Sequence, residues 1–139
     1  MNVKVSDIMI QNVVTSVKHK SVGHIRQIMN DQGIHSLPIV SPNNEVEGIV
    51  TSQDFLEDHS QETPVSQIMT KSVYTVPLYS DVYIAARIMR NHHIHHLVVT
   101  DDKKVVGVLS SFDLLSLVED HRFVMKNPPT PAKKKSGRV

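Results

Sequence analysis

The sequence predicts a mixed α/β (α+β) fold in which one β-α-β-β-α unit occurs twice and the two pseudo-symmetric copies pack face to face. Residues 5–9 (VSDIM) return sixty positions later as residues 65–69 (VSQIM). Residues 48–56 return as residues 107–115, with a glycine, a hydroxyl residue and an aspartate at the same spacing. Each half of the 139 residues is too short to bury a robust core alone, so a shared core is expected.

Each copy is expected to open with a short helical turn that is followed by a brief strand. A serine in front of an Ile-Met pair is a good N-cap for such a turn, and it occurs as Ser6 and Ser66. The strands are indicated by β-prone residues at 13–15 and 73–76.

A longer helix is expected next in each copy, because apolar residues recur there at helical spacing. In the first copy the helix should begin after Ser21, a good N-cap, and end at Gly33. In the second copy Asp81 stands near the N-cap position, and the helix should continue to Arg90.

A hairpin and a last helix should complete each copy. The first strand of each hairpin is a continuous apolar run, which is typical of a buried strand. The first strand, the turn and the second strand are expected at 37–40, 42–44 and 46–51 in the first copy, and at 97–99, 101–103 and 105–110 in the second. The last helices should begin at Ser52 and Ser111.

This order of elements divides the chain into a first unit at 1–60, a second unit at 61–121 and a tail at 122–139. Residues 58–64 are expected to link the two units. The tail is basic and rich in proline and lysine, so it is expected to be disordered.

Composition and charge exclude several classes of protein. With no cysteine, the chain has neither a disulfide framework nor thiol chemistry. It has no 18-residue apolar stretch and no apolar run in its first 25 residues, so a membrane span and a signal peptide are not expected, and the cytoplasm is the expected location. The net charge is +1; residues 126–139 carry +5, which leaves −4 for residues 1–125. An acidic body does not favour nucleic acid, for which only the basic tail remains as a contact.

The motif that carries chemistry is Gly-x-x-(Thr/Ser)-x-x-Asp, which ends a strand and starts a helix in each copy. Its polar members are Thr51 and Asp54 in the first copy and Ser110 and Asp113 in the second. Unpaired N–H groups at a helix start, beside a hydroxyl, can hold a phosphate, and the aspartate can accept hydrogen bonds from ribose hydroxyls. Helix capping is the structural alternative for the same residues. Because the pattern occurs twice in a duplicated frame, it favours nucleotide binding.

With these landmarks, residues 1–120 resemble the tandem CBS (cystathionine-β-synthase) domains, whose paired form is called a Bateman module. The resemblance rests on the Ile-Met turn, on Ile-His-x-Leu at the entry to a buried strand, and on the glycine-hydroxyl-aspartate motif, in the same order twice. It implies a non-catalytic sensor that binds AMP, ADP, ATP or S-adenosylmethionine between the copies, with or without Mg²⁺, and that needs no obligatory cofactor. It also implies a homodimer that signals to a separate effector protein. A dimerisation or interaction scaffold with vestigial nucleotide pockets is the alternative.

The resemblance implies two pseudo-symmetric sites, each joining the motif of one copy to residues of the other that lie beside the base. The first site would consist of Ser110, Asp113, Val14, Ile34 and His35. The second site would consist of Thr51, Asp54, Tyr74, Ile94 and His95. Tyr74 is bulkier than its counterpart Val14, so its ring would either stack on the adenine or fill the pocket.

Histidines surround Ile94, and they allow three interpretations. They are His92, His93, His95 and His96, and His35 repeats His95 in the first copy. Beside a phosphate, histidines such as His96 would take up protons, so that affinity would fall as the pH rises. A metal site is not expected, because three ligands would have to converge without cysteine or a fixed carboxylate. The third interpretation is an exposed polar junction between a helix and a strand.

Catalytic residues are not expected. No residue resembles a nucleophile that is activated by a neighbouring base and an orienting group.

Overall fold

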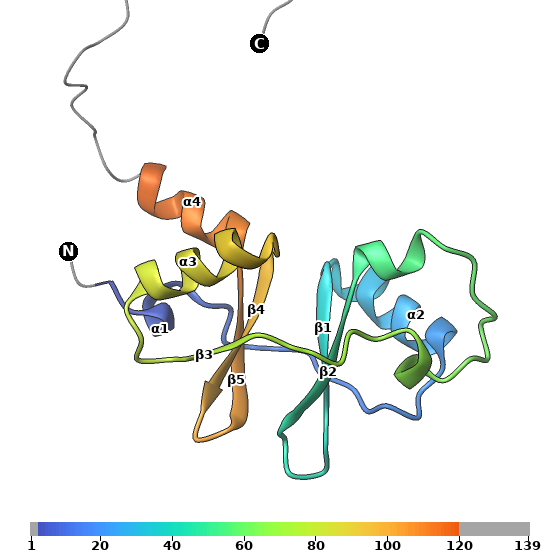
Figure 1. Cartoon of the computed structure of the whole chain (residues 1–139). Helices are drawn as coiled ribbons and strands as arrows, with labels where there is room; N and C mark the ends of the chain where they lie inside the picture. Colours follow the sequence, from blue (N-terminus) through green and yellow to red (C-terminus); the bar gives the residue numbers. More distant parts are fainter. Residues whose placement is uncertain (1–2, 120–139) are drawn as a thin grey trace, which may run out of the picture.

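The computed structural model describes residues 3–119, and Figure 1 shows two small sheets in the middle of the molecule with helices on their outer sides. The fold is mixed α/β, as predicted, and the order of elements repeats. The elements are α1 (Val5–Ile8), α2 (Val22–Gln32), β1 (Ser36–Val40), β2 (Val46–Thr51), the 3-10 turns η1 (Ser52–Phe55) and η2 (Val65–Gln67), β3 (Thr75–Pro77), α3 (Val82–His92), β4 (His96–Asp101), β5 (Lys104–Ser110) and α4 (Ser111–Glu119). The tail expected at 122–139 lies outside the described residues.

The two hairpins correspond closely to each other and to the prediction. β1 pairs antiparallel with β2, and Ser36 lies opposite Thr51; β4 pairs antiparallel with β5, and His96 lies opposite Ser110. Each hairpin has an irregularity in its register near the end of its first strand. The first strands are buried at 37–40 and 97–99, because helices cover one face of each sheet and the other copy covers the opposite face.

The long helices differ at their ends. The Ser21 hydroxyl accepts a hydrogen bond from the His24 N–H at 3.1 Å, and Gly33 ends α2 with a φ of 64°. Asp81 is the N-cap of α3 by backbone position, but its carboxylate makes no capping hydrogen bond. His93 takes the place of Gly33 with a φ of 54°, a left-handed conformation that costs a residue with a Cβ more than it costs glycine.

Three local expectations are wrong. Ser6 and Ser66 lie inside their turns, and the N-cap positions belong to the residues before Val5 and Val65. Residues 13–15 form no strand, and the residue after them, Ser16, forms an isolated bridge to Ile39 of β1. The helix expected from Ser52 ends after one 3-10 turn, because the polar residues 57–62 give it no apolar face to bury.

The first turn of each copy packs into the core of the other copy. Val5 of α1 is completely buried in the core formed by α3, β4 and β5, and Val65 of η2 is completely buried in the core formed by α2, β1 and β2. The Val5 N–H donates to the Ser80 carbonyl at 2.9 Å, and the Val65 N–H donates to the Lys20 carbonyl at 2.7 Å. Burying a valine side chain contributes about 1.5–3 kcal/mol. Each copy therefore depends on the other for part of its core.

This exchange explains the glycine of the repeated motif. A Cβ atom at Gly107 would lie 2.7 Å from the Met9 sulfur, and a Cβ atom at Gly48 would lie 2.5 Å from the Met69 sulfur. The methionine of each exchanged turn thus packs directly on the backbone of the opposite hairpin. The Ile-Met turn and the motif glycine, which are two separate landmarks in the sequence, therefore contact each other in the structure.

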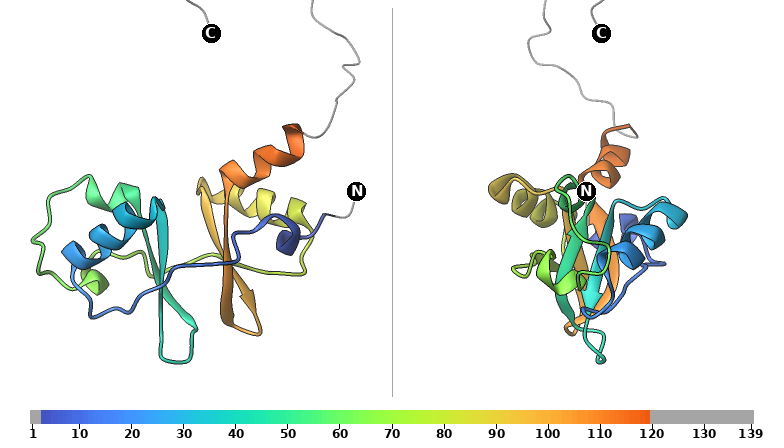
Figure 2. Two further views of the ribbon diagram at one scale, coloured as in Figure 1. Left: turned by 180° about the vertical axis from the view of Figure 1, so that it is seen from behind. Right: turned by 90° about the vertical axis from the view of Figure 1, so that its right-hand side faces the viewer.

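The hairpins of the two copies also meet face to face. Val40 and Ile49 of the first copy form one buried cluster with Val98 and Val105 of the second. Near the hairpin turns, the Val105 N–H donates to the Asn44 carbonyl at 3.0 Å, and the Asn44 amide donates to the Val105 carbonyl at 3.0 Å. Figure 2 shows the two hairpins side by side, so the shared core predicted from the repeat is confirmed.

Candidate functional site

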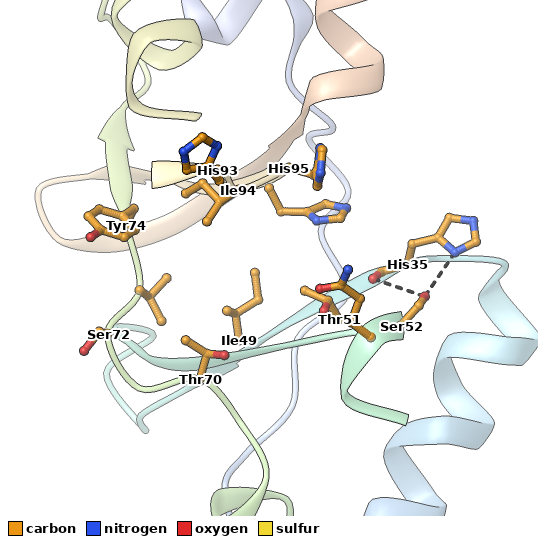
Figure 3. A pocket seen from close by; sticks show the side chains of 13 residues that line it. His35, Ile49, Thr51, Ser52, Thr70, Ser72, Tyr74, His93, Ile94 and His95 are labelled. Atoms are coloured by element: carbon orange, nitrogen blue, oxygen red, sulfur yellow. Dashed lines mark hydrogen bonds between the residues drawn. The ribbon is translucent and has the colours of Figure 1, made fainter. Parts of the chain in front are cut away.

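A cavity of about 430 Å³ lies between the two copies, and Figure 3 shows the side chains that line it. Its volume is in the range of small-molecule sites. The lining residues are His35, Ile49, Thr51, Ser52, Gln53, Thr70, Ser72, Val73, Tyr74, His93, Ile94, His95 and His96.

Four junctions of the chain supply most of these residues. His35 lies between α2 and β1, Thr51 ends β2 and directly precedes η1, residues 70–74 lead from η2 into β3, and residues 93–96 join α3 to β4. Figure 3 shows Ile49 and Ile94 pointing toward each other across the cavity. The cavity therefore has apolar walls from both copies and a set of hydroxyl and imidazole groups around them.

The structure brings together most of the second predicted site. Thr51, Tyr74, Ile94 and His95 all line the cavity, whereas Asp54 does not. His96 lines it as well.

The first predicted site does not form as one group in this cavity. His35, which was expected there, lines the cavity of the second site. Ile34 and His35 line a separate hollow of about 560 Å³ between α2 and η1. Val14, Ser110 and Asp113 are not among the lining residues of the cavities described for residues 3–119.

Both aspartates of the repeated motif are engaged in helix capping. The Thr51 N–H donates to Asp54 Oδ2 at 2.8 Å, and the Asp54 N–H donates to the Thr51 hydroxyl. In the second copy the Ser110 N–H donates to Asp113 Oδ2 at 2.8 Å, and the Asp113 N–H donates to Ser110 Oγ at 3.2 Å. The expectation that these N–H groups are unpaired is therefore wrong. Within residues 3–119, neither Oδ1 atom accepts a hydrogen bond, so each carboxylate keeps one oxygen for another donor.

Two histidines are oriented in the same way in the two copies. His35 Nδ1 lies 3.2 Å from Ser52 Oγ, and His95 Nδ1 lies 3.2 Å from Ser111 Oγ. Each serine thus holds the ring of its histidine at the edge of the cavity. Among residues 3–119, no group of three or more His, Cys, Asp or Glu is placed to hold a metal ion.

The pKa of His96 is lowered by its surroundings. Burial lowers the pKa of its ring, His95 and His35 lower it further, and Asp113 opposes them. His96 is therefore close to a histidine of each copy, His35 and His95, and to the motif residue Asp113 of its own copy. These surroundings favour the neutral form of the His96 ring.

Tyr74 stands at the rim of the cavity with its ring stacked on His92. The ring centroids are 4.0 Å apart, the planes are inclined by 22°, and Tyr74 is 42% exposed. One face of the tyrosine ring is thus covered by His92.

Several lining residues were missed in the sequence. Thr70 and Ser72 follow the Ile-Met turn of the second copy, and Ile49 belongs to the first. Ile49 and Thr70 pair through two backbone hydrogen bonds of 2.9 and 3.0 Å. No local pattern signals this contact, because it depends on the exchange of turns between the copies.

The sequence model of the CBS domain matches the chain twice, at residues 5–59 and 65–120. The chain belongs to the CBS domain family. The CBS domain pair of protein MJ0100, in complex with 5′-methylthioadenosine and S-adenosyl-L-methionine, is 29% identical with a TM-score of 0.80, and the match covers 86% of this chain and 98% of that one. The CBS domain protein PAE2072 from Pyrobaculum aerophilum, complexed with AMP, shares the fold at 21% identity and a TM-score of 0.76, over 84% and 99% of the two chains.

The CBS pair also resembles a part of longer proteins. It is 37% identical to a homoserine O-acetyltransferase of Methanosalsum zhilinae over 123 residues, which are 87% of this chain and 25% of that protein. The CBS pair spans about a quarter of the length of the transferases it matches. None of the helices formed by residues 3–119 is long and apolar enough to cross a membrane.

Proposed function

We propose that this CBS pair is a non-catalytic regulatory module that binds an adenosyl ligand in the cavity between its copies. The observation that carries the proposal is the composition of the cavity wall, in which Thr51 of one copy faces Tyr74, Ile94 and His95 of the other. The likeness to a CBS pair that binds 5′-methylthioadenosine and S-adenosyl-L-methionine supports the choice of ligand class.

The cavity residues have distinct proposed roles. Ile49 and Ile94 would hold the flat apolar base between the copies. Tyr74, with one ring face on His92, would offer its other face to the base. Asp54 is tied to Thr51 by its Oδ2 atom, and its Oδ1 atom would accept a hydrogen bond from the ribose.

The first predicted site is proposed as a second, pseudo-symmetric position for the same kind of ligand. Asp113 keeps one carboxylate oxygen in the same way as Asp54, and Ser110 corresponds to Thr51. Val14 and Ile34 are partly buried members of the core beside it. No Mg²⁺ cage formed by residues 3–119 accompanies either position, so Mg²⁺ would enter only with the phosphates of a nucleotide.

The proposed mechanism is a clamp. A ligand that touches both copies stabilises the arrangement in which they are closest, and it shifts the equilibrium only by its differential affinity for the two arrangements. The changed surface would be read by a partner protein. The exchanged turns make such a change cooperative, because moving one copy disturbs the core of the other.

We propose that the module forms a homodimer through its helices. On α4, Phe112, Leu115 and Val118 are exposed by 78%, 57% and 54%, and their spacing places them on one face. A two-fold interface is the commonest way to cover such a face.

The competing function is a dimerisation or interaction scaffold with vestigial pockets. The capping boxes favour it, since Asp54 and Asp113 have a structural role without any ligand. The exposed apolar face of α4 fits this function equally well.

Titration calorimetry of the full chain with adenosine, 5′-methylthioadenosine, S-adenosylmethionine and AMP separates the two functions. We expect at least one compound to bind, and Tyr74→Ala to weaken it about tenfold, since stacking of a base on an aromatic ring contributes about 1–3 kcal/mol. Tyr79→Ala is the control, because Tyr79 is 67% exposed and does not line the cavity. Absence of binding by the whole panel would favour the scaffold.

A further inference from the structure

Residues 3–119 place no permanent cation in the wall of the central cavity. Among residues 3–119, the groups that line it are imidazoles, hydroxyls, one amide and apolar side chains, without lysine or arginine. Proteins that hold phosphate groups usually provide such cations, because a phosphate brought out of water needs strong, preferably charged, donors. The cavity therefore lacks the usual partner of a nucleotide phosphate.

The two arginines beside the cavity are placed in neighbouring hollows. Arg26 lines the hollow between α2 and η1, where its guanidinium stacks 5.0 Å from the centre of the Phe55 ring and donates to the Phe55 carbonyl at 3.4 Å. Arg90 lines the hollow between α3 and α4. Neither arginine lines the central cavity.

Backbone N–H groups at the start of η1, including those of Thr51 and Ser52, already have partners within the chain. The Thr51 N–H donates to Asp54 at 2.8 Å, and the Asp54 N–H donates to the Thr51 hydroxyl. The Ser52 N–H donates to the His35 carbonyl at 3.0 Å. In place of an anion from solution, the junction holds the carboxylate of its own Asp54. A phosphate brought beside Thr51 would meet this like charge.

Burial lowers the pKa of the His96 ring, and its neighbours His95 and His35 lower it further, so this histidine favours its neutral form. The cavity therefore favours a ligand with no negative charge near Thr51.

We infer that the cavity takes an adenosyl group whose 5′ carbon carries no phosphate, such as a 5′-thioether, rather than AMP, ADP or ATP. This inference rests on the proposed function and narrows its ligand class. The base and ribose would use the contacts proposed above. A neutral thioether or a sulfonium would leave no unpaired negative charge beside Asp54, and it would suit the apolar walls formed by Ile49 and Ile94.

The test is calorimetry of the full chain at about pH 7.5 and ~0.15 M salt. The compounds are 5′-methylthioadenosine, adenosine, AMP and ATP. We expect 5′-methylthioadenosine to bind at least about tenfold more tightly than AMP, and ATP to bind no more tightly than AMP. AMP or ATP that binds as tightly as 5′-methylthioadenosine would overturn the inference and leave the proposed function standing. If neither these four compounds nor S-adenosylmethionine binds, the proposed function fails and the inference fails with it.

A gain of cation should change the preference. Gln53 is exposed at the cavity wall next to the Thr51–Ser52 junction, so Gln53→Arg supplies the missing charge. We expect this variant to raise the affinity for AMP relative to 5′-methylthioadenosine by about tenfold. Gln67→Arg is the matched control, because Gln67 is exposed on η2 and does not line the cavity. An unchanged ratio in Gln53→Arg, or an equal change in Gln67→Arg, would contradict the inference.

Discussion

Replacing Gly107 by alanine tests the exchange of turns between the copies. The new methyl group would lie 2.7 Å from the Met9 sulfur and 2.9 Å from the Ile10 carbonyl oxygen, both closer than ordinary contact at 3.4 Å. The sulfur can move with its flexible side chain. The carbonyl is held, because it accepts a hydrogen bond from the Val108 N–H at 3.2 Å.

Gly48→Ala is the matched comparison. The three atoms nearest to its new methyl group all belong to the Met69 side chain, so the clash can be relieved without moving the backbone. Overpacking costs about 1–3 kcal/mol, and the lower entropy of the unfolded alanine chain offsets about 0.4–1 kcal/mol. Neither glycine has a positive φ, so backbone strain adds nothing.

The expected net loss is about 2 kcal/mol for Gly107→Ala and below about 1 kcal/mol for Gly48→Ala. Urea denaturation measures both values, provided that the slope of unfolding free energy against urea stays the same. If Gly48→Ala were as destabilising as Gly107→Ala, the contact between α1 and the second hairpin would not be the one described.

Three further predictions concern the helix ends, His96 and the motif aspartates. Both Gly33 and His93 have a positive φ, which favours glycine. Gly33→Ala should therefore destabilise the fold by about 1 kcal/mol, and His93→Gly should stabilise it by about 0.5 kcal/mol. Unfolding temperatures that shift in the same direction in both variants would refute this. The pKa of His96 is lowered in the folded state. Below about pH 6.5 the unfolded chain therefore binds more protons than the folded chain does. The free energy of unfolding should fall as the pH falls from there through the folded pKa. The variant His96→Ser carries the residue type that the first copy has at this place. Denaturation at several pH values should show that its free energy of unfolding falls less on acidification than that of the original chain. An equal fall would exclude His96 as the source of the pH dependence. Asp54→Ala should weaken adenosyl binding more than Asp113→Ala does, because Thr51, the hydrogen-bond partner of Asp54, lines the cavity. Each change should also lower the free energy of unfolding by about 1 kcal/mol through the lost cap. Calorimetry that shows the larger loss of affinity in Asp113→Ala would contradict the assignment.

The fold could be predicted from the sequence where the determining pattern is local. The buried runs at 37–40 and 97–99, the turns after them and the cap at Ser21 depend on residues close in sequence, and these elements were predicted within a few residues. The length of the helix from Ser52 was not predicted correctly, because the point where it ends depends on whether the following residues have an apolar face to bury. The same sequence signature gives a full helix, α4, when apolar residues follow Ser111.

The site could be predicted only where the repeat itself defines it. Comparison of the copies identified Thr51, and the resemblance carried by the repeat assigned Ile94; both line the cavity. Thr70 could not be found in this way, because it reaches the cavity through pairing with Ile49 of the other copy. His35 lines the central cavity and also, with Ile34, the hollow between α2 and η1, so its assignment to the first site stays a prediction.

A crystal structure of the full chain grown with saturating 5′-methylthioadenosine is the decisive test of ligand binding between the copies. We expect electron density for the ligand there, with its base between Ile49 and Ile94 and its ribose beside Thr51 and Asp54. Density for the ligand outside this cavity, or an empty cavity in crystals grown at a concentration that saturates binding in solution, would contradict it.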